Sequence, residues 1–200
     1  MSENHPRLFH IRGSSHAATH CHHLHIPVQS ACNETLKRMN RPYTIEQFKE
    51  KINYIRSCIP NISISTDVIA GFVQESDEEF EMTYENLADL ELSFFHVFPY
   101  SKRNGTKAST LKGEINGNVT KARVARLLEL SNACRERDMK RFNPVQVLIE
   151  RKQDGYYTGY TSQYHSCKIL SDTPLSGRIT IEWDRIEDGT YYGKKDDVCD

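Results

Sequence analysis

The 200-residue chain has no long hydrophobic run, since its uninterrupted apolar stretches span only a handful of residues. A membrane-spanning helix requires roughly 20 such residues, so the chain is not expected to cross a membrane. No apolar segment near its start has the character of a secretory signal. The six cysteines are scattered instead of forming a dense framework, which predicts reduced thiols in a cytoplasmic protein. Tryptophan occurs once, but ten Tyr and eight Phe suffice for a core and exclude wholesale disorder.

Basic residues are absent from residues 74–93, which carry eight acidic residues. Residues 102–141 instead carry eleven basic and four acidic residues, so the overall net charge of −1 is the sum of opposed blocks. A basic block beside an acidic one predicts a polyanionic partner that binds one preferred face. Two solvated helices of opposite charge would give the same pattern, and both interpretations stay open.

The hydrophobic periodicity divides the chain into a leader and two domains. Residues 1–20 show neither helical nor strand periodicity and are expected to be poorly ordered. Residues 21–141 alternate between the two periods, which predicts an α/β fold with a parallel sheet or part of a (βα) barrel. Strands are predicted at 23–28, 62–69 and 94–98, and helices at 45–59, 76–90 and 120–141, the first two capped by Thr44 and Ser76.

Residues 142–200 switch to the period of two that is typical of strands. Short strands with turn signals about every ten residues predict a small all-β barrel of five strands. The expected strands lie near 145–149, 156–161, 167–170, 177–183 and 190–193.

Three loops follow the predicted parallel strands, and ligands gather at this edge of such sheets. The first begins at Gln29 and Ser30, whose side chains can hydrogen-bond a ribose or a carboxylate. The second begins at Gly71, where the missing Cβ allows close backbone approach to a ligand, and the third is the cationic segment 100–106. Polar residues in any one of these loops would be ordinary. Three such loops at successive strand ends indicate a shared ligand cleft.

Three strings of this sequence resemble the radical-SAM tRNA methylthiotransferases. They are HIPVQSACNETLKRMNRPYT at 25–44, STDVIAGFVQESDEEF at 65–80 and FPYSKRNGT at 98–106. The branch that acts on threonylcarbamoyladenosine in tRNA is the most similar. The resemblance implies that residues 21–141 are the carboxy-terminal half of a partial (βα) barrel with parallel strands. The string GYTSQYHSCKIL at 159–170 is similar to the TRAM domain, a small RNA-binding β-barrel of these enzymes.

The resemblance implies an enzyme that cleaves S-adenosylmethionine (SAM) with a 4Fe-4S cluster and installs a methylthio group on a tRNA base. It implies a SAM cleft in which arginine would hold the carboxylate of the cofactor, because a guanidinium binds carboxylates through two parallel hydrogen bonds. The cofactor-binding residues implied are Gln29, Ser30, Arg38, Asp67, Gly71, Glu75 and Tyr100.

The tRNA partner is expected to contact the basic helix and the loop before it, because phosphate neutralisation dominates RNA affinity. Residues 142–200 carry seven basic and ten acidic residues and are poorly suited to that task. The predicted RNA-binding residues are Lys102, Arg103, Arg123, Arg126 and Arg137.

The chain departs from the family pattern at the cluster motif. CxxxCxxC is absent, and the cysteines at 21, 32, 58, 134, 167 and 199 offer no equivalent spacing, so this chain alone is expected to be inactive. The usual GFPGET turn reads GFVQES at 71–76, which places Gln74 where glycine supplies conformational freedom. No catalytic residue is identified.

Two alternatives and two secondary expectations remain. The first alternative is a non-catalytic RNA-binding or vestigial protein. The second is an unrelated hydrolase or metal enzyme, for which the sequence shows no Ser/His/acid triad and no set of metal ligands. Cys21 and the histidines at 16, 20, 22, 23 and 25 match no known metal-site spacing, so no metal site is predicted there. A half barrel exposes a sheet edge, which predicts self-association.

Overall fold

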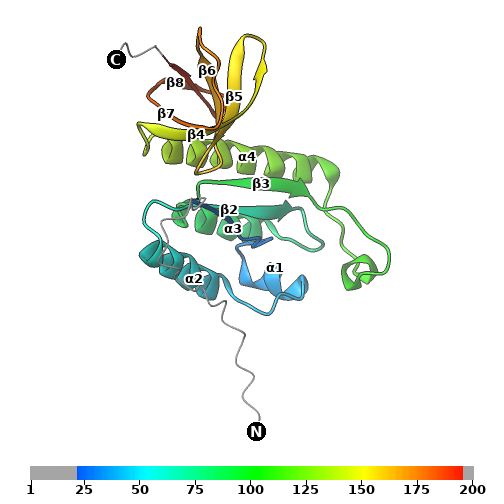
Figure 1. Ribbon diagram of the computed structural model, residues 1–200. Helices are drawn as coiled ribbons and strands as arrows, with labels where there is room; N and C mark the ends of the chain where they lie inside the picture. The colour runs from blue at the N-terminus through cyan, green and yellow to red at the C-terminus, as the bar shows by residue number, and fades with distance from the viewer. Residues whose placement is uncertain (1–21, 196–200) are drawn as a thin grey trace.

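The computed structural model describes residues 22–195, so the predicted leader, Cys21 and Cys199 lie outside the described residues. Two sheets are joined by one long helix, α4, which lies between them in Figure 1. None of the helices within 22–195 has the length and apolarity needed to span a membrane. The first part comprises β1 (His23–His25), α1 (Asn33–Arg38), α2 (Ile45–Cys58), β2 (Ser63–Ala70), α3 (Asp77–Asp89), β3 (Phe94–Pro99), the 3-10 turn η1 (Lys107–Thr110) and α4 (Gly117–Met139).

The first sheet has the order β1-β2-β3, and both pairs are parallel. This confirms the α/β class and the parallel order expected from the alternating periods. β1 is shorter than the predicted 23–28, and Pro27, which has no N–H to donate to a ladder, lies just beyond it. The short helix α1, which the periodicity did not reveal, follows the end of β1.

Local capping explains where α2 and α3 begin. The Thr44 hydroxyl accepts a hydrogen bond from Gln47 N, while the Gln47 side chain accepts one from Thr44 N. Ser76 and Glu79 form the same reciprocal pair ahead of α3. Both boxes satisfy amide groups that the first helical turn leaves without partners, and both were predicted from the sequence.

The two faces of the parallel sheet have different roles. One face carries Leu24, Ile64, Val68 and Phe95, which belong to a core shared with the apolar sides of α2, α3 and α4. Because strand side chains alternate, the other face carries residues 25, 67 and 96, which are half-buried or exposed. The helices therefore cover a single face of the sheet.

The second sheet has six strands in the order β7-β4-β5-β6-β9-β8. The prediction of five strands is wrong in this detail, because the expected strand at 177–183 ends at Ile181 and an unpredicted strand covers residues 183–187. Its core includes Val147, Ile169 and Tyr191. The strands are β4 (Val145–Gln153), β5 (Tyr156–Thr161), β6 (Ser166–Leu170), β7 (Arg178–Ile181), β8 (Trp183–Glu187) and β9 (Thr190–Lys194).

Asp138, near the end of α4, connects the two sheets. Its carboxylate accepts a hydrogen bond of 2.6 Å from Ser63 Oγ at the start of β2. It also lies 2.9 Å from Nε2 of His165 in the β5–β6 connection and 2.7 Å from Nη1 of Arg141. Asp138 and His165 are both buried. We refer to Ser63, Asp138, Arg141 and His165 as the junction network.

Candidate functional site: a hollow at the carboxyl edge of the parallel sheet

Three chain segments leave the parallel sheet at the same edge. Gln29, four residues beyond β1, still pairs with Val68, since its N–H donates to Asp67 O at 2.8 Å and its carbonyl accepts from Ile69 N at 2.8 Å. β2 ends at Ala70, and the N–H of Tyr100 donates to the Ala70 carbonyl just beyond β3. The strand-end loops thus begin side by side.

A hollow of about 320 Å³ opens at this edge. This volume lies at the lower end of the range that small-molecule sites occupy. Its walls come from α1 and the turn after it, from the end of β2 and from the loop after β3. The lining residues are Arg38, Met39, Asn40, Arg41, Ile69, Phe72, Thr106, Lys107 and Ala108.

Glu75 supports the edge from within. It is 2% exposed, and its Oε2 accepts hydrogen bonds from Gly71 N at 2.8 Å and from Arg123 Nη1 at 2.7 Å. Arg123 also donates to Asp77 Oδ1 at 2.7 Å. Burial raises the pKa of Glu75 above its ordinary value despite these donors. Glu75 therefore points into the protein and stabilises this edge. This placement differs from the direct contact with a cofactor that the resemblance implied.

Gln74 adopts the backbone conformation for which the family uses glycine. Its φ is +63°, and the strained turn is held by hydrogen bonds from Gln74 N to Gly113 O and from Gln74 Nε2 to Lys112 O, at 2.9 and 2.8 Å. Such a conformation costs a non-glycine residue of order 1 kcal/mol. Gln74 therefore takes the conformation in which glycine is expected to have the advantage, and hydrogen bonds to the 112–113 backbone stabilise it there.

Two other predicted cofactor-binding residues are engaged inside the protein. Ser30 is fully buried, with its Oγ 3.2 Å from Thr83 Oγ1. The guanidinium of Arg38 forms two hydrogen bonds with Glu79, which lower the pKa of that carboxyl group. Arg41, which also lines the hollow, is exposed. The carboxylate-binding role assigned to arginine therefore fits Arg41 better than Arg38.

Tyr100 has an unsatisfied polar group beside the hollow. Its hydroxyl is buried and has no hydrogen-bond partner within residues 22–195. Its ring packs edge-on against Phe72, a lining residue, with 5.0 Å between centroids. A buried hydroxyl without a partner is costly, so this group is a ready donor or acceptor for a ligand.

The described cysteines do not fit an iron–sulfur cluster. Cys32, Cys134 and Cys167 are buried, Cys58 is exposed, and all four are free. Burial raises the pKa of Cys134, and that of Cys167 to about 12, which disfavours the thiolate that binds iron. No group of three metal-ligating side chains within 22–195 includes a cysteine. The described part of the chain thus holds no cluster site.

The predicted RNA-binding residues differ in their availability. Lys102 and Arg126 are exposed ion-pair partners of Glu114 and Glu81, at 3.1 and 2.5 Å. Arg103 and Arg137 are exposed, and neither has an ion pair among residues 22–195. Arg123 is 5% exposed and is held by the acidic residues described above, so its predicted phosphate contact is contradicted by its burial.

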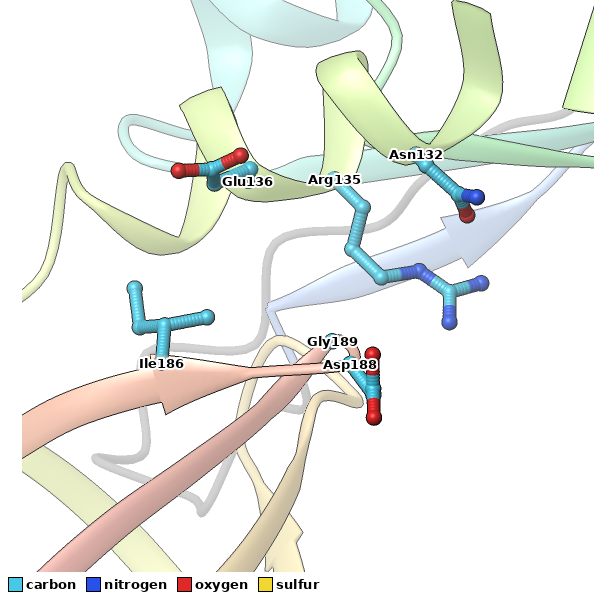
Figure 2. Close-up of a pocket in the computed structure, with 6 residues that line it drawn as sticks. All are labelled: Asn132, Arg135, Glu136, Ile186, Asp188 and Gly189. Carbon is cyan, nitrogen blue, oxygen red and sulfur yellow. The ribbon is translucent and has the colours of Figure 1, made fainter. Parts of the chain in front are cut away.

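A second hollow, of about 490 Å³, lies between α4 and the β8–β9 hairpin. Figure 2 shows Arg135 reaching from α4 towards Asp188 and Gly189. Its guanidinium carbon lies 4.5 Å from the centroid of the Phe94 ring, and its buried Nε has no partner within the described residues. Sequence reasoning counted Arg135 only as part of the basic block, because the β8–β9 hairpin that faces it is distant in sequence.

Replacing Gly71 with alanine should lower the free energy of unfolding by about 2–3 kcal/mol. Gly71 has a φ of +73°, and a Cβ there would lie 2.7 Å from Thr120 Cγ2, so backbone strain and a steric clash add. Urea unfolding monitored by circular dichroism measures the change. Gly105→Ala is the control, because Gly105 has a φ of +83° and no atom near the added Cβ. Equal losses in the two variants would mean that the Thr120 clash relaxes without cost.

Comparisons with known proteins find a family model and several relatives that match this chain. Residues 15–87 match the model of the Radical SAM superfamily. The chain is 36% identical over 164 residues to the threonylcarbamoyladenosine tRNA methylthiotransferase MtaB of Bacillus subtilis, covering 78% of this chain and 36% of that protein. It is 41% identical over 165 residues to the tRNA-2-methylthio-N(6)-dimethylallyladenosine synthase of Thermodesulfovibrio yellowstonii, covering 81% of this chain and 38% of that protein.

A solved structure also aligns with part of the chain. It is coproporphyrinogen III oxidase (HemN) from Escherichia coli, described as a radical SAM enzyme, which aligns with 58% of this chain at 20% identity and a TM-score of 0.46, over 27% of its own length. The chain spans little more than a third of the length of the two curated relatives named above.

Proposed function

Because this chain belongs to the radical-SAM tRNA methylthiotransferase family, we propose that it supplies the tRNA-binding surface and part of the SAM cleft of such an enzyme. The substrate proposed is a threonylcarbamoyl-modified adenosine in tRNA, and the second sheet is proposed to be a TRAM domain. The cytoplasmic location predicted from the scattered cysteines belongs to the same proposal.

The observation that carries the proposal is the hollow at the carboxyl edge of the parallel sheet. Its lining includes Phe72 and Thr106, which come from two of the three segments that the sequence predicted to share a ligand, while α1 and the turn after it supply the rest in place of Gln29 and Ser30. Two groups at or beside the hollow suit a nucleoside with a charged tail. The buried Tyr100 hydroxyl has no internal partner, and Arg41 is free to form paired hydrogen bonds with a carboxylate. Bound SAM would supply the radical chemistry of the family, while these residues bind and orient it.

The cluster chemistry is not assigned to the described residues, because their thiols do not converge. We therefore propose that the 200-residue chain alone binds tRNA without cleaving SAM. Iron and sulfide reconstitution under anaerobic conditions tests this half of the proposal, and stoichiometric cluster uptake with SAM cleavage would refute it.

Exposed aromatic side chains on the second sheet are proposed to complete the tRNA surface. Tyr160 and Tyr164 are 39% and 54% exposed, and their rings stack with centroids 5.0 Å apart and an interplanar angle of 14°. Such a surface can stack unpaired bases. Arg103 and Arg137, which have no internal ion pairs, are left to bind phosphates.

The double variant Arg103→Gln/Arg137→Gln should weaken tRNA binding roughly tenfold and reduce the slope of log K against log salt by about two. Each substitution removes one exposed cation that forms no ion pair within the described residues. Filter binding of tRNA at several salt concentrations measures both effects. Lys49→Gln/Lys51→Gln on α2 removes the same charge and should leave the binding almost unchanged.

Two outcomes would decide against parts of this proposal. Absence of tRNA binding by the unaltered chain at low salt would reject the tRNA-binding role. Equal weakening by both double variants would mean that the attraction is diffuse and that Arg103 and Arg137 form no specific surface.

A non-catalytic RNA-binding role is the second candidate, favoured by the absence of a cluster site among the described residues. Equilibrium binding of SAM separates the two candidates. SAM binding that Arg41→Ala weakens is expected for the first candidate, whereas tRNA binding without any SAM binding supports the second.

A further inference from the structure

Two histidines and an aspartate gather on the face of the parallel sheet that no helix covers. His25 comes from β1, Asp67 from β2 and His96 from β3. Asp67 is the direct register partner of His96, and His25 is the partner of Ser65, so the three side chains emerge on one face of neighbouring strands. One ligand atom from each lies within 4.8 Å of the other two.

We propose that His25, Asp67 and His96 form a binding site for a divalent transition-metal ion of the Zn²⁺ type. Two imidazoles and one carboxylate are ligands that Zn²⁺ and its neighbours prefer, whereas Mg²⁺ and Ca²⁺ prefer oxygen alone. This is the one group of three such ligands within residues 22–195. The inference goes beyond the proposed function and requires neither tRNA nor SAM.

The spacing of the donor atoms is close to that of a metal site. His25 Nε2 lies 3.3 Å from Asp67 Oδ2, which matches the roughly 3.4 Å between two donors placed tetrahedrally about 2.1 Å from one ion. The widest separation allowed by the group, 4.8 Å, would need to close by about 1.4 Å. His96 is exposed, so a side-chain rotation can supply that movement.

The neighbouring residues orient His25 and leave the Asp67 carboxylate without a competing cation. Ser65 Oγ lies 2.9 Å from His25 Nδ1. If Nδ1–H donates to this hydroxyl, the lone pair of Nε2 is directed at the metal position, as in metal sites whose histidines are held by an outer partner. No Lys or Arg nitrogen of the described residues lies within 4.0 Å of the Asp67 carboxylate, whose ion-pair partner is His25.

The open side of the group gives the ion a position for solvent or a small ligand. Phe94 and Phe98 lie in the same strand as His96, and their ring centroids are 5.5 and 6.5 Å from that of His96. Three protein ligands with a remaining free position are typical of metal ions that bind or activate a further ligand. Asp67 was also assigned to the SAM cleft by resemblance, so the ion would lie in the wall of that cleft.

Titration with Co²⁺ tests the site, because Co²⁺ bound by nitrogen and oxygen ligands absorbs visible light. The protein used is the full chain with His16, His20 and His22 replaced by alanine, which removes three of the competing histidines near its start. We expect one equivalent of Co²⁺ to bind and Zn²⁺ to displace it. Asp67→Asn and His96→Ala should each weaken binding at least tenfold, whereas Asp89→Asn, an exposed carboxylate on α3, should not change it.

Two results would overturn the proposal. One is an absence of visible absorption at one equivalent of Co²⁺ in the protein that lacks the three histidines. The other is unchanged affinity in His96→Ala, which would reduce the group to a His25–Asp67 ion pair. Circular dichroism of each variant verifies that it is folded. Failure of tRNA binding has no bearing on either result, so the two proposals are tested separately.

Discussion

Replacing Asp138 with alanine is expected to lower the free energy of unfolding by about 3 kcal/mol and to separate the unfolding of the two sheets. The substitution leaves Ser63 and His165 buried without their shared acceptor. The α4 backbone, the hydrogen bond from the Tyr191 hydroxyl to the Met139 carbonyl at 2.7 Å and the stacking of the His23 and Tyr164 rings would still link the two parts.

Two spectroscopic signals distinguish the parts during urea unfolding. Trp183 is the single tryptophan and belongs to the second sheet, where its Nε1–H donates to the Phe142 carbonyl at 2.6 Å, so its fluorescence reports that sheet. Circular dichroism at helical wavelengths reports α2, α3 and α4. The two transitions should coincide in the unaltered chain and diverge in Asp138→Ala, with Asp184→Ala, an exposed residue of β8, as control. Coincident transitions in Asp138→Ala would mean that the junction network does not couple the sheets.

The stabilisation by Asp138 should depend on pH. Burial by itself would raise the pKa of Asp138, but hydrogen bonds from His165 and Ser63 outweigh it and hold the pKa below its ordinary value of 3.8. A carboxyl group with a lowered pKa in the folded state stabilises the protein above its unfolded-state pKa. The difference in unfolding free energy between the unaltered chain and Asp138→Ala should therefore be constant near neutral pH and diminish as the pH falls below about 4.

Replacing Glu75 with alanine is expected to cost about 3 kcal/mol and to loosen the edge hollow. The change removes the acceptor of Gly71 N and leaves the buried guanidinium of Arg123 with Asp77 and a backbone carbonyl alone. The urea midpoint of the circular dichroism transition measures the loss. Glu81→Ala is the matched control, because Glu81 forms an exposed pair with Arg126, and exposed pairs contribute at most about 1 kcal/mol.

A double variant separates the ion pair from the packing around it. Glu75→Ala/Arg123→Met removes both buried charges and should be more stable than Glu75→Ala alone, since no uncompensated cation remains. The raised pKa of Glu75 indicates that its charge is poorly solvated, which supports this order. If the double variant loses as much as the sum of the two single variants, the pair is not coupled.

The sequence predicted most of the first part of the fold because its signals are local. The caps at Thr44 and Ser76 and the alternation of the two hydrophobic periods depend on neighbouring residues, and the structure confirms the helices and parallel strands that they indicated. The strand at 183–187 was missed, because whether a short segment forms a strand depends on its partners across the sheet.

The candidate site was predicted less completely because burial and pairing are not local. The order of the loops at one sheet edge followed from the parallel topology. That Arg123 lies inside the protein did not, since its partners Glu75 and Asp77 belong to a loop and helix more than 40 residues earlier. The His25, Asp67 and His96 group was missed for the same reason, although the period of two in each strand placed them on one face.

The helix α4 runs without interruption from the edge hollow to the junction network, so its length fixes the distance between them. Arg123 near its start supports the edge hollow, and Asp138 near its end belongs to the junction network. Fifteen positions of helix separate them, which is about 22 Å. A nucleoside is shorter than that interval, so one bound at the edge hollow would not also contact the junction network.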